Sequence, residues 1–163
     1  MAKKRKKYII GIDLGGTKML TGLLNRRFEI LETSKQRTEP SRGAQYFLKT
    51  IKKSIDNVLE DAGLSLKHID SIGVGCPGII SVESGKVLLS PNIPFLKNFP
   101  LKDKLEKLFR VPVIIENDVN AGLYGEYQLG AARGSQHIVG IFPGTGVGGA
   151  LILNGKLYRG ATG

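Results

Sequence analysis

The sequence contains a single cysteine and no apolar run long enough to span a membrane. Because Cys76 is alone among the 163 residues, a framework of internal disulfides is excluded and a reducing compartment is favoured. The apolar segment nearest the start of the chain, residues 9–14, is interrupted by Gly11 and Asp13 and is too short for a signal peptide or a membrane helix. We therefore expect a cytoplasmic protein that makes no membrane contact.

Acidic residues are scarce: 14 Asp and Glu stand against 24 Lys and Arg, which gives a formal net charge of +10. Residues 3–7 are all basic, and such a run can bind nucleic acid or another acidic surface. It has no interleaved aromatic residues and no periodicity, however. We expect residues 1–7 to be a solvated, disordered tail and do not expect nucleic acid as a partner, while the scattered basic residues elsewhere suit polyphosphate ligands.

Several common classes of protein are excluded by what the rest of the sequence lacks. There is no internal repeat, no low-complexity segment beyond the tail, and no G-x-x-x-x-G-K-[ST] motif, so the chain is not a P-loop protein. The length, a hydrophobic content of 41% and a mean hydropathy of -0.05 indicate a globular chain of one domain or slightly more.

The hydrophobic pattern predicts an α/β fold that begins with a three-stranded meander. Residues 8–12 are apolar like a buried strand, and apolar residues resume at Met19, so the glycine turn between them joins two strands in a hairpin. Residues 28–33 predict the third strand. A helix follows, with Ser41 as its expected cap and Gly63 as its end. Its apolar face comprises Ala44, Phe47, Leu48, Ile51, Ile55, Val58, Leu59 and Ala62.

The remaining pattern alternates strands with helices, which indicates a mixed sheet. In order, it predicts a strand at 69–75, a small hairpin with residues 83–85 at its tip, a rigid loop at 90–94, a helix at 100–109 with Leu101, Leu105 and Leu108 inward, a strand at 113–115, a helix at 119–129, and strands at 138–142 and 147–153. Asn154 and Gly155 then form a strong two-residue hairpin turn.

A carboxylate and a glycine turn follow the first strand. Asp13 ends a buried strand, where a carboxylate without a partner is costly, so it is a candidate metal ligand. Gly15 and Gly16 allow a tight turn whose backbone N–H groups can approach a ligand, and Thr17 and Lys18 add a hydroxyl and a cation. The stretch predicts a phosphate-binding hairpin; a structural glycine hairpin with a solvated Asp13 remains the alternative.

A second cluster of polar residues, Glu116, Asn117 and Asp118, lies between an apolar strand and a helix. The carboxyl ends of strands in open α/β sheets are where ligands bind. Asn117 offers both a donor and acceptors to a sugar hydroxyl, and Asp118 could take a proton from a hydroxyl that attacks a phosphate. The alternative is that Asp118 is only a helix N-cap, which would explain one residue of the three.

Residues 144–149 contain the spacing G-x-G-x-x-G, which in dinucleotide-binding proteins opens a helix. Here residues 150–153 are apolar and run into Asn154 and Gly155, which predicts a strand and a hairpin. The dinucleotide-binding interpretation therefore fails, and a second glycine-rich hairpin with Thr145 at its tip remains. Two such hairpins with a carboxylate at a helix start between them form a much more specific pattern than any one of the three.

Together these motifs resemble the ROK family, which comprises bacterial sugar kinases, glucokinases among them, and sugar-responsive repressors. The motifs are residues 11–18 (GIDLGGTK), 75–78 (GCPG), 90–92 (SPN), 116–121 (ENDVNA) and 144–149 (GTGVGG). The resemblance implies an actin-like ATPase fold with two ribonuclease-H-like domains, with ATP and Mg²⁺ in the cleft between them and a hexose against the first. We expect residues 8–118 to form the first domain and residues 119–163 to begin the second.

The resemblance also implies roles for individual residues. By position, Asp118 matches the catalytic base, Asn117 a ligand of sugar hydroxyls, and Asp13 the residue that orients Mg²⁺. Gly78 and Asn92 match positions that line the sugar pocket. The first phosphate loop would be Gly15, Gly16, Thr17 and Lys18, and the second Gly144, Thr145, Gly146 and Gly148.

The sequence departs from the family pattern in three places. Pro143 precedes the second phosphate loop, where it should end or bend the strand, and Ala150 replaces a common glycine. Family members also continue past the position of Gly163 into a Glu-x-x-Gly-His segment that binds the sugar, a cysteine cluster for structural zinc, an adenosine pocket and a closing helix. We therefore expect a fragment that is inactive by itself, with zinc only in the missing part.

Three functions follow from the resemblance. The first is an ATP-dependent hexose kinase, with glucose as the favoured sugar and a homo-oligomer as the expected assembly. The second is a sugar-responsive repressor, which would need a helix-turn-helix before the first phosphate loop, where only seven residues precede Tyr8. The third is a catalytically silent actin-like domain; both glycine loops and Asp118 argue against this function for the parent protein, but not for the fragment.

Overall fold

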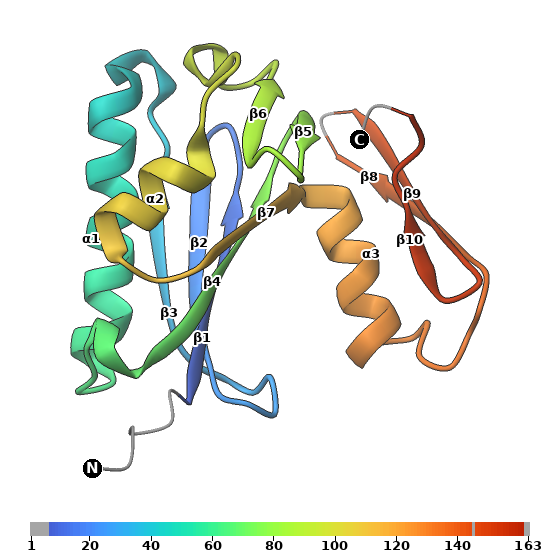
Figure 1. Cartoon of the computed structure of the whole chain (residues 1–163), viewed down its shortest axis with the longest axis horizontal. Helices are drawn as coiled ribbons and strands as arrows, with labels where there is room; N and C mark the ends of the chain where they lie inside the picture. Colours follow the sequence, from blue (N-terminus) through green and yellow to red (C-terminus); the bar gives the residue numbers. More distant parts are fainter. Residues whose placement is uncertain (1–6, 145, 162–163) are drawn as a thin grey trace.

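The computed structural model describes residues 7–144 and 146–161, so Thr145 and most of the expected basic tail lie outside the described residues (Figure 1). The strands are β1 (Tyr8–Leu14), β2 (Lys18–Leu24), β3 (Ile30–Arg37), β4 (Ile69–Cys76), β5 (Ile79–Ser81), β6 (Lys86–Leu89), β7 (Val113–Asn117), β8 (Ile138–Pro143), β9 (Val147–Leu153) and β10 (Lys156–Tyr158). The α-helices are α1 (Gly43–Asp61), α2 (Leu101–Phe109) and α3 (Asp118–Leu129), and short 3₁₀ turns are η1 (Pro40–Arg42), η2 (Leu66–His68) and η3 (Pro94–Leu96).

A five-stranded mixed sheet with the order β3-β2-β1-β4-β7 forms the centre of the first half. The meander β1-β2-β3 is antiparallel, whereas β1, β4 and β7 run parallel. This order follows from the connections, because tight turns join antiparallel neighbours while a helix crosses over between parallel ones. The α/β class, the mixed sheet and the actin-like fold expected from the sequence are confirmed.

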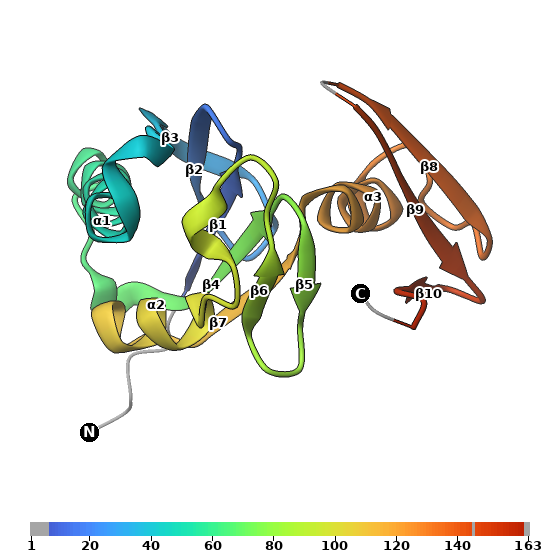
Figure 2. The same ribbon diagram turned by 90° about the horizontal axis from the view of Figure 1, so that it is seen from above.

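The two faces of this sheet differ in chemistry. Ile10, Ile12 and Leu14 of β1 point to one face and are buried, while Gly11 and Asp13 alternate onto the other. Helices α1 and α2 cover the apolar face and α3 lies against the opposite one (Figure 2). The buried face of α1 includes Phe47, Ile51, Ile55, Val58 and Leu59, as its periodicity predicts.

The end of α1 follows the prediction, but its start does not. Gly63 has φ 63°, and the N–H groups of Gly63 and Leu64 donate to the carbonyls of Glu60 and Leu59, which is a Schellman motif. Ser41 lies in η1, and Arg42 stands at the N-cap without a side-chain cap, so the prediction that Ser41 caps α1 is wrong. Pro40 starts a separate 3₁₀ turn, which displaces the helix start to Gly43.

Two other boundaries differ from the sequence prediction. Strand β3 begins at Ile30 because the Asn25 side chain accepts hydrogen bonds from the N–H groups of Arg27 and Glu29, which extends the turn and leaves Phe28 in a left-handed conformation. In α2, Leu108 is exposed and Phe109 is buried in its place. The buried residues Leu101, Leu105 and Phe109 are spaced four residues apart. The prediction was therefore right for the first two and wrong by one position for the third.

The second half of the chain is a three-stranded sheet of order β10-β9-β8 packed on α3. Its own small apolar cluster centres on Leu123, Ala150 and Ile152 and is separate from the main core. The turn at Asn154 and Gly155 has positive φ at both residues, which confirms the predicted tight hairpin. Among the described residues, no helix is both long and apolar enough to cross a membrane.

Two glycine substitutions should change stability in opposite directions. A Cβ at Gly63 or at Gly125 would have no atom within 4 Å, so neither change creates a clash. Gly63→Ala should lower the free energy of unfolding by about 1–2 kcal/mol, because only the left-handed backbone is penalised. Gly125→Ala, in the exposed interior of α3, should raise the stability of that helix by about 0.5–1 kcal/mol. Urea unfolding measures both, and an unchanged Gly63→Ala would contradict the Schellman assignment.

Candidate functional site

The carboxyl ends of the parallel strands bring the two predicted carboxylates together. Asp13 of β1 pairs in register with Gly75 of β4, and Gly75 pairs with Glu116 of β7. A Cβ at Gly75 would lie only 3.4 Å from the Cα of Asp118 and 3.7 Å from the Cβ of Ala121. The absence of a side chain at Gly75 therefore lets the first turn of α3 approach the sheet, which places Asp118 beside Asp13.

Asp13 and Asp118 repel one another electrostatically. Burial raises the pKa of the Asp13 carboxyl above its ordinary value, and the nearby Asp118 charge raises this pKa further. Within the described part of the chain, Asp13 has no hydrogen bond or ion pair to offset either effect. Both carboxylates line one hollow of about 540 Å³ over the open face of the sheet.

This arrangement fits a magnesium ion bound together with a phosphate ligand. The described residues contain no cluster of three or more His, Cys, Asp or Glu side chains that could hold a metal ion. Mg²⁺, however, is commonly held by one or two carboxylates plus substrate phosphates rather than by a cage of protein ligands. Asp13 is the carboxylate that such an ion would stabilise most directly, because its charge is both desolvated and repelled.

The N-cap of α3 is Asn117. It lies one residue before Asp118, which the sequence analysis considered as a possible cap. Its Oδ1 accepts hydrogen bonds from the N–H groups of Val119, at 2.9 Å, and Asn120, at 3.0 Å. Asp118 is thus the first residue of the helix, and its Oδ1 accepts from the N–H of Val119 at 3.0 Å. The interpretation of Asp118 as the helix cap is wrong, because Asn117 occupies the cap position and the Asp118 carboxylate only shares the Val119 N–H with it.

Gly78 and Asn92 lie against the same end of the sheet. Asn117 Nδ2 donates to the Gly78 carbonyl at 3.0 Å, and Gly78 has φ 118°. A Cβ at Gly78 would clash with the carbonyl oxygen of Leu89, so only glycine fits here. A Cβ at Gly16 would lie 2.7 Å from the Cβ of Asn92, which shows that the 90–92 loop packs on the first glycine hairpin.

Thr38 holds the first glycine hairpin in shape, a role that the sequence analysis missed. Its side chain is fully buried, and its Oγ1 donates to the Gly15 carbonyl at 2.7 Å. Its N–H donates to the Thr17 carbonyl at 2.9 Å, while Gly15 N–H donates to Lys18 O at 2.9 Å. No local signal marks Thr38, because it follows β3 in a Thr-Glu-Pro connection that looks like an ordinary loop.

The second glycine hairpin joins β8 to β9 and packs on the same helix turn. Strand β8 ends at Pro143, as predicted, and Gly144 N–H donates to Gly146 O at 2.8 Å. A Cβ at Gly148 would lie 2.6 Å from Cγ2 of Val119. Consecutive residues at the start of α3 therefore contact different sheets: Asp118 lies over Gly75, and Val119 lies against Gly148.

Comparisons with known proteins identify the family and agree with the fold. The sequence matches the ROK family over residues 9–163. It is 37% identical over 155 residues to a glucokinase of Thermotoga maritima, and this match covers 95% of this chain and 47% of the relative. It is 35% identical over 155 residues to a xylose repressor of Caldicellulosiruptor bescii, and this match covers 95% of this chain and 39% of the relative. The structure resembles a Streptomyces griseus ROK glucokinase in complex with glucose and AMPPNP, with a TM-score of 0.85, 36% identity, and coverage of 96% of this chain and 47% of that one. The chain thus spans about half the length of the relatives it matches.

Thr38→Val should loosen the first glycine hairpin. The variant keeps the shape of the side chain but removes the hydrogen bond to the half-buried Gly15 carbonyl, so the free energy of unfolding should fall by about 0.5–1.5 kcal/mol. Hydrogen exchange should become faster at the amides of Gly15 and of residue 38, whose N–H groups donate to the Lys18 and Thr17 carbonyls. Thr21→Val is the matched control, because Thr21 is equally buried and hydrogen-bonds Ser54 away from the hairpin. Equal hairpin exchange in the two variants would show that Thr38 has no special role there.

Asp13→Asn should stabilise the chain in the absence of metal and remove its response to Mg²⁺. The substitution ends the repulsion with Asp118, an effect of about 1 kcal/mol or less because the carboxyls are partly exposed. Without Mg²⁺, the melting temperature of the variant should therefore be higher than that of the original chain. Added Mg²⁺ with a nucleoside triphosphate should stabilise the original chain but not the variant. Asp70→Asn, on the same sheet but at the opposite end of β4, should change neither quantity. A variant that still responds to Mg²⁺ would exclude Asp13 as a ligand.

Proposed function

The chain belongs to the ROK family, and from this we propose that it forms the sugar- and phosphate-binding half of an ATP-dependent hexose kinase, with glucose as the favoured hexose. The observation that carries the proposal is the first turn of α3, where Asp118 lies beside Asp13 and over Gly75, and where the next residue, Val119, lies against Gly148 of the second glycine hairpin. A carboxylate at the first position of a helix, in a hollow with a second carboxylate, suits proton transfer next to a phosphate.

In the proposed reaction, a hexose hydroxyl oxygen attacks the γ-phosphorus of ATP. The bond between that phosphorus and the bridging oxygen of ADP breaks, and the Asp118 carboxylate accepts the proton of the hydroxyl. Asp13 would hold Mg²⁺, with Asp118 beside it, and the ion would neutralise charge on the phosphates. This chain's own contribution is therefore to position one base and to keep two carboxylates close at the end of the sheet.

The first hairpin can supply the phosphate contacts. Gly15 N–H is occupied by the Lys18 carbonyl, but the N–H groups of Gly16 and Thr17 have no hydrogen-bond partner among the described residues. Two successive free N–H groups in a turn form an anion-binding concavity, to which the exposed Lys18 adds a positive charge. Gly144, Thr145, Gly146 and Gly148 would contribute the second such surface from the opposite side.

Asn117, Gly78 and Asn92 would bind the sugar. Asn117 Oδ1 already accepts two hydrogen bonds from the helix, and one N–H of its amide is directed to the Gly78 carbonyl. An amide nitrogen carries two hydrogens, so one donor remains for a sugar oxygen. The same contacts fix the orientation of that donor, which favours recognition of a hydroxyl in a defined position. The division into domains at residue 118 and a homo-oligomeric assembly remain predictions.

A sugar-responsive regulator is the second candidate, because a xylose repressor is among the similar proteins. In that case the same pocket would bind a sugar without transferring a phosphoryl group. The two functions share the sugar site and differ in whether Asp118 is needed for turnover, so one experiment can separate them.

Asp118→Asn tests the proposed function in a chimera in which this chain replaces the matching half of the Thermotoga maritima glucokinase. With Mg-ATP and glucose, the chimera should turn over at about 1–100 s⁻¹, which is usual for kinases. Asp118→Asn should lower kcat by about 10²–10⁴-fold, because positioned proton transfer is lost, while the Kd for glucose changes little.

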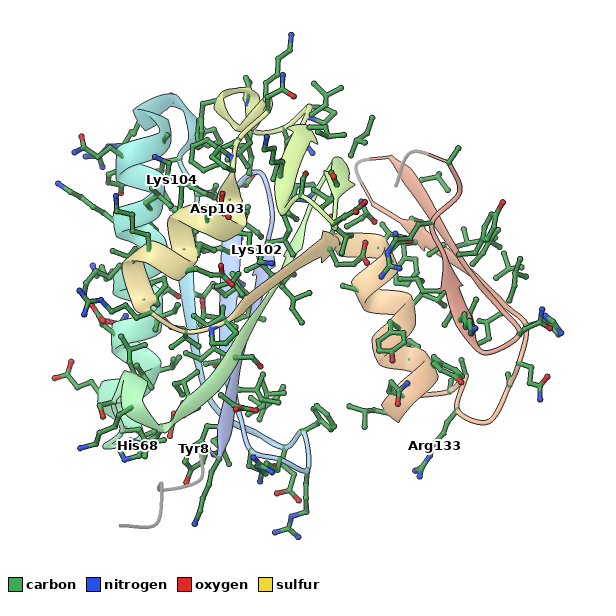
Figure 3. All side chains as sticks on the ribbon, in the orientation of Figure 1. Tyr8, His68, Lys102, Asp103, Lys104 and Arg133 are labelled. Carbon is green, nitrogen blue, oxygen red and sulfur yellow. The ribbon has the colours of Figure 1, made fainter. Side chains whose placement is uncertain are left out.

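Asp103→Asn is the control, since Asp103 is exposed on α2, well away from α3 (Figure 3). A chimera that binds glucose without turnover would favour the regulator. Near-normal kcat in Asp118→Asn would exclude this residue as the base.

A further inference from the structure

Glu116 and Arg159 form an ion pair between segments that lie 43 residues apart in the sequence. We infer that this pair is a latch that holds the end of β10, and with it the second glycine hairpin, in position against the start of α3. Glu116 and Arg159 are thus positioning residues. Their effect on catalysis rests on the proposed kinase function, whereas the latch itself does not.

The Glu116 carboxylate is shared between the two halves of the chain. Arg159 Nε and Nη2 both contact Oε2, at 2.7 and 2.6 Å. The other oxygen, Oε1, accepts from the N–H of Asn117 at 2.9 Å and from Nδ2 of Asn120 at 3.2 Å. One oxygen therefore secures the N-cap of α3 and the buried Asn120, and the other secures the residue that follows β10.

The burial of Glu116 distinguishes this pair from the other ion pairs of the described residues. Its side chain is only 14% exposed, whereas the acids of the other three pairs are 37–57% exposed and lie within four residues of their partners. Arg159 is 43% exposed, so the pair lies at the surface of the protein with its carboxylate directed inward. Loss of Arg159 leaves this largely buried carboxylate without its charged partner, which costs more than the loss of an exposed local pair. The link between Glu116 and Arg159 should therefore be maintained in solution.

Apolar packing alone does not fix β10 at this place. Arg159 borders two hollows, one of about 280 Å³ that Asn117, Asn120 and Tyr158 also line, and one of about 610 Å³ that reaches Tyr124 and Leu157. Strand β10 has three residues and, among the described residues, pairs with β9 alone. Leu157 packs on the small cluster of Leu123, Ala150 and Ile152. The ion pair adds a polar restraint to this apolar contact at the end of the strand.

The restraint reaches both parts of the proposed site. Strand β10 pairs with β9, which carries Gly148 against Val119, so the position of β10 influences the second hairpin. On the other side, Glu116 lies two residues before Asp118 and hydrogen-bonds its neighbour Asn117. The distance between the second hairpin and Asp118 therefore depends on one charge-assisted contact, the hydrogen-bonded ion pair of Glu116 and Arg159.

Hydrogen exchange of the 163-residue chain tests the latch without reference to activity. The variants are Glu116→Gln, which keeps an acceptor for Asn117 and Asn120, Arg159→Gln, and the double variant. In each single variant, the amides of β10 and of β9 at residues 151–153 should exchange at least about tenfold faster, and the double variant should add little, because both changes break the same contact. Amides of β1 and β4 should be unaffected.

Arg133→Gln is the matched control for loss of an arginine charge from the same half of the chain. Arg133 is exposed after α3, and Figure 3 shows its side chain directed away from the protein. Exchange in this variant should equal that of the original chain. The latch is excluded if β10 exchanges equally fast with and without Arg159, or if the effects of the two single substitutions simply add.

Kinetics of the kinase chimera test the consequence for positioning. Because misplacement by about 1 Å can cost about 10²-fold in rate, Arg159→Gln should lower kcat by ~10- to 100-fold and raise the KM for ATP, while the KM for glucose stays within about twofold. Arg159→Lys, which keeps the charge, should restore part of kcat. If the unmodified chimera is active and Arg159→Gln matches it in both constants, positioning through the latch is wrong. An inactive chimera would instead reject the proposed function, with hydrogen exchange still deciding on the latch.

Discussion

The hydrogen bonds that Asn117 accepts from the first N–H groups of α3 are the interaction on which the rest of the site depends. Because Asn117 is the cap, Asp118 becomes the first helical residue and is directed over Gly75, while Val119 meets Gly148. If the helix started one residue later, Asp118 would become the non-helical cap and Val119 the first helical residue, so neither side chain would keep its present direction. The local choice of cap thus decides which sheet each of these residues contacts.

Close approach of backbones explains why glycines gather around this turn. Glycine weakens a strand by roughly 0.5–1 kcal/mol relative to alanine, so its presence within β4 and β9 needs a compensating reason. At Gly75 and Gly148 that reason is contact with α3 from opposite sides, and at Gly78 it is the neighbouring Leu89 carbonyl. The helix start therefore lies between two positions, Gly75 and Gly148, where a side chain would meet α3 itself, while glycine at position 78 keeps the Leu89 loop close to the same end of the sheet.

The parts of the fold that the sequence predicted are those governed by local rules. Alternation identified β1 and β2, helical periodicity identified the buried face of α1, and left-handed glycine at position 63 ended that helix as expected. Local rules could not predict the long-range hydrogen bonds. Thr38 donates to Gly15, which is 23 residues away in the sequence, and Arg159 donates to Glu116, which is 43 residues away. The cap was misassigned for a different reason, because Asn117 and Asp118 are both good caps and only the length of β7 decides between them.

The two carboxylates at the centre of the site oppose the stability of the chain that carries them. Since burial and the charge of Asp118 raise the pKa of Asp13, its protonated form favours the folded state, and its ionised form opposes folding at any pH above that raised value. Protons relieve the repulsion as the pH falls, and a divalent cation could relieve it at neutral pH without neutralising Asp118. The polar contacts of Asn117, Thr38 and Glu116 hold the backbone around this pair in place, so the repulsion persists in the folded chain instead of moving the carboxylates apart. A site held in this state gains most from a ligand that brings positive charge, which is the property that a divalent cation supplies.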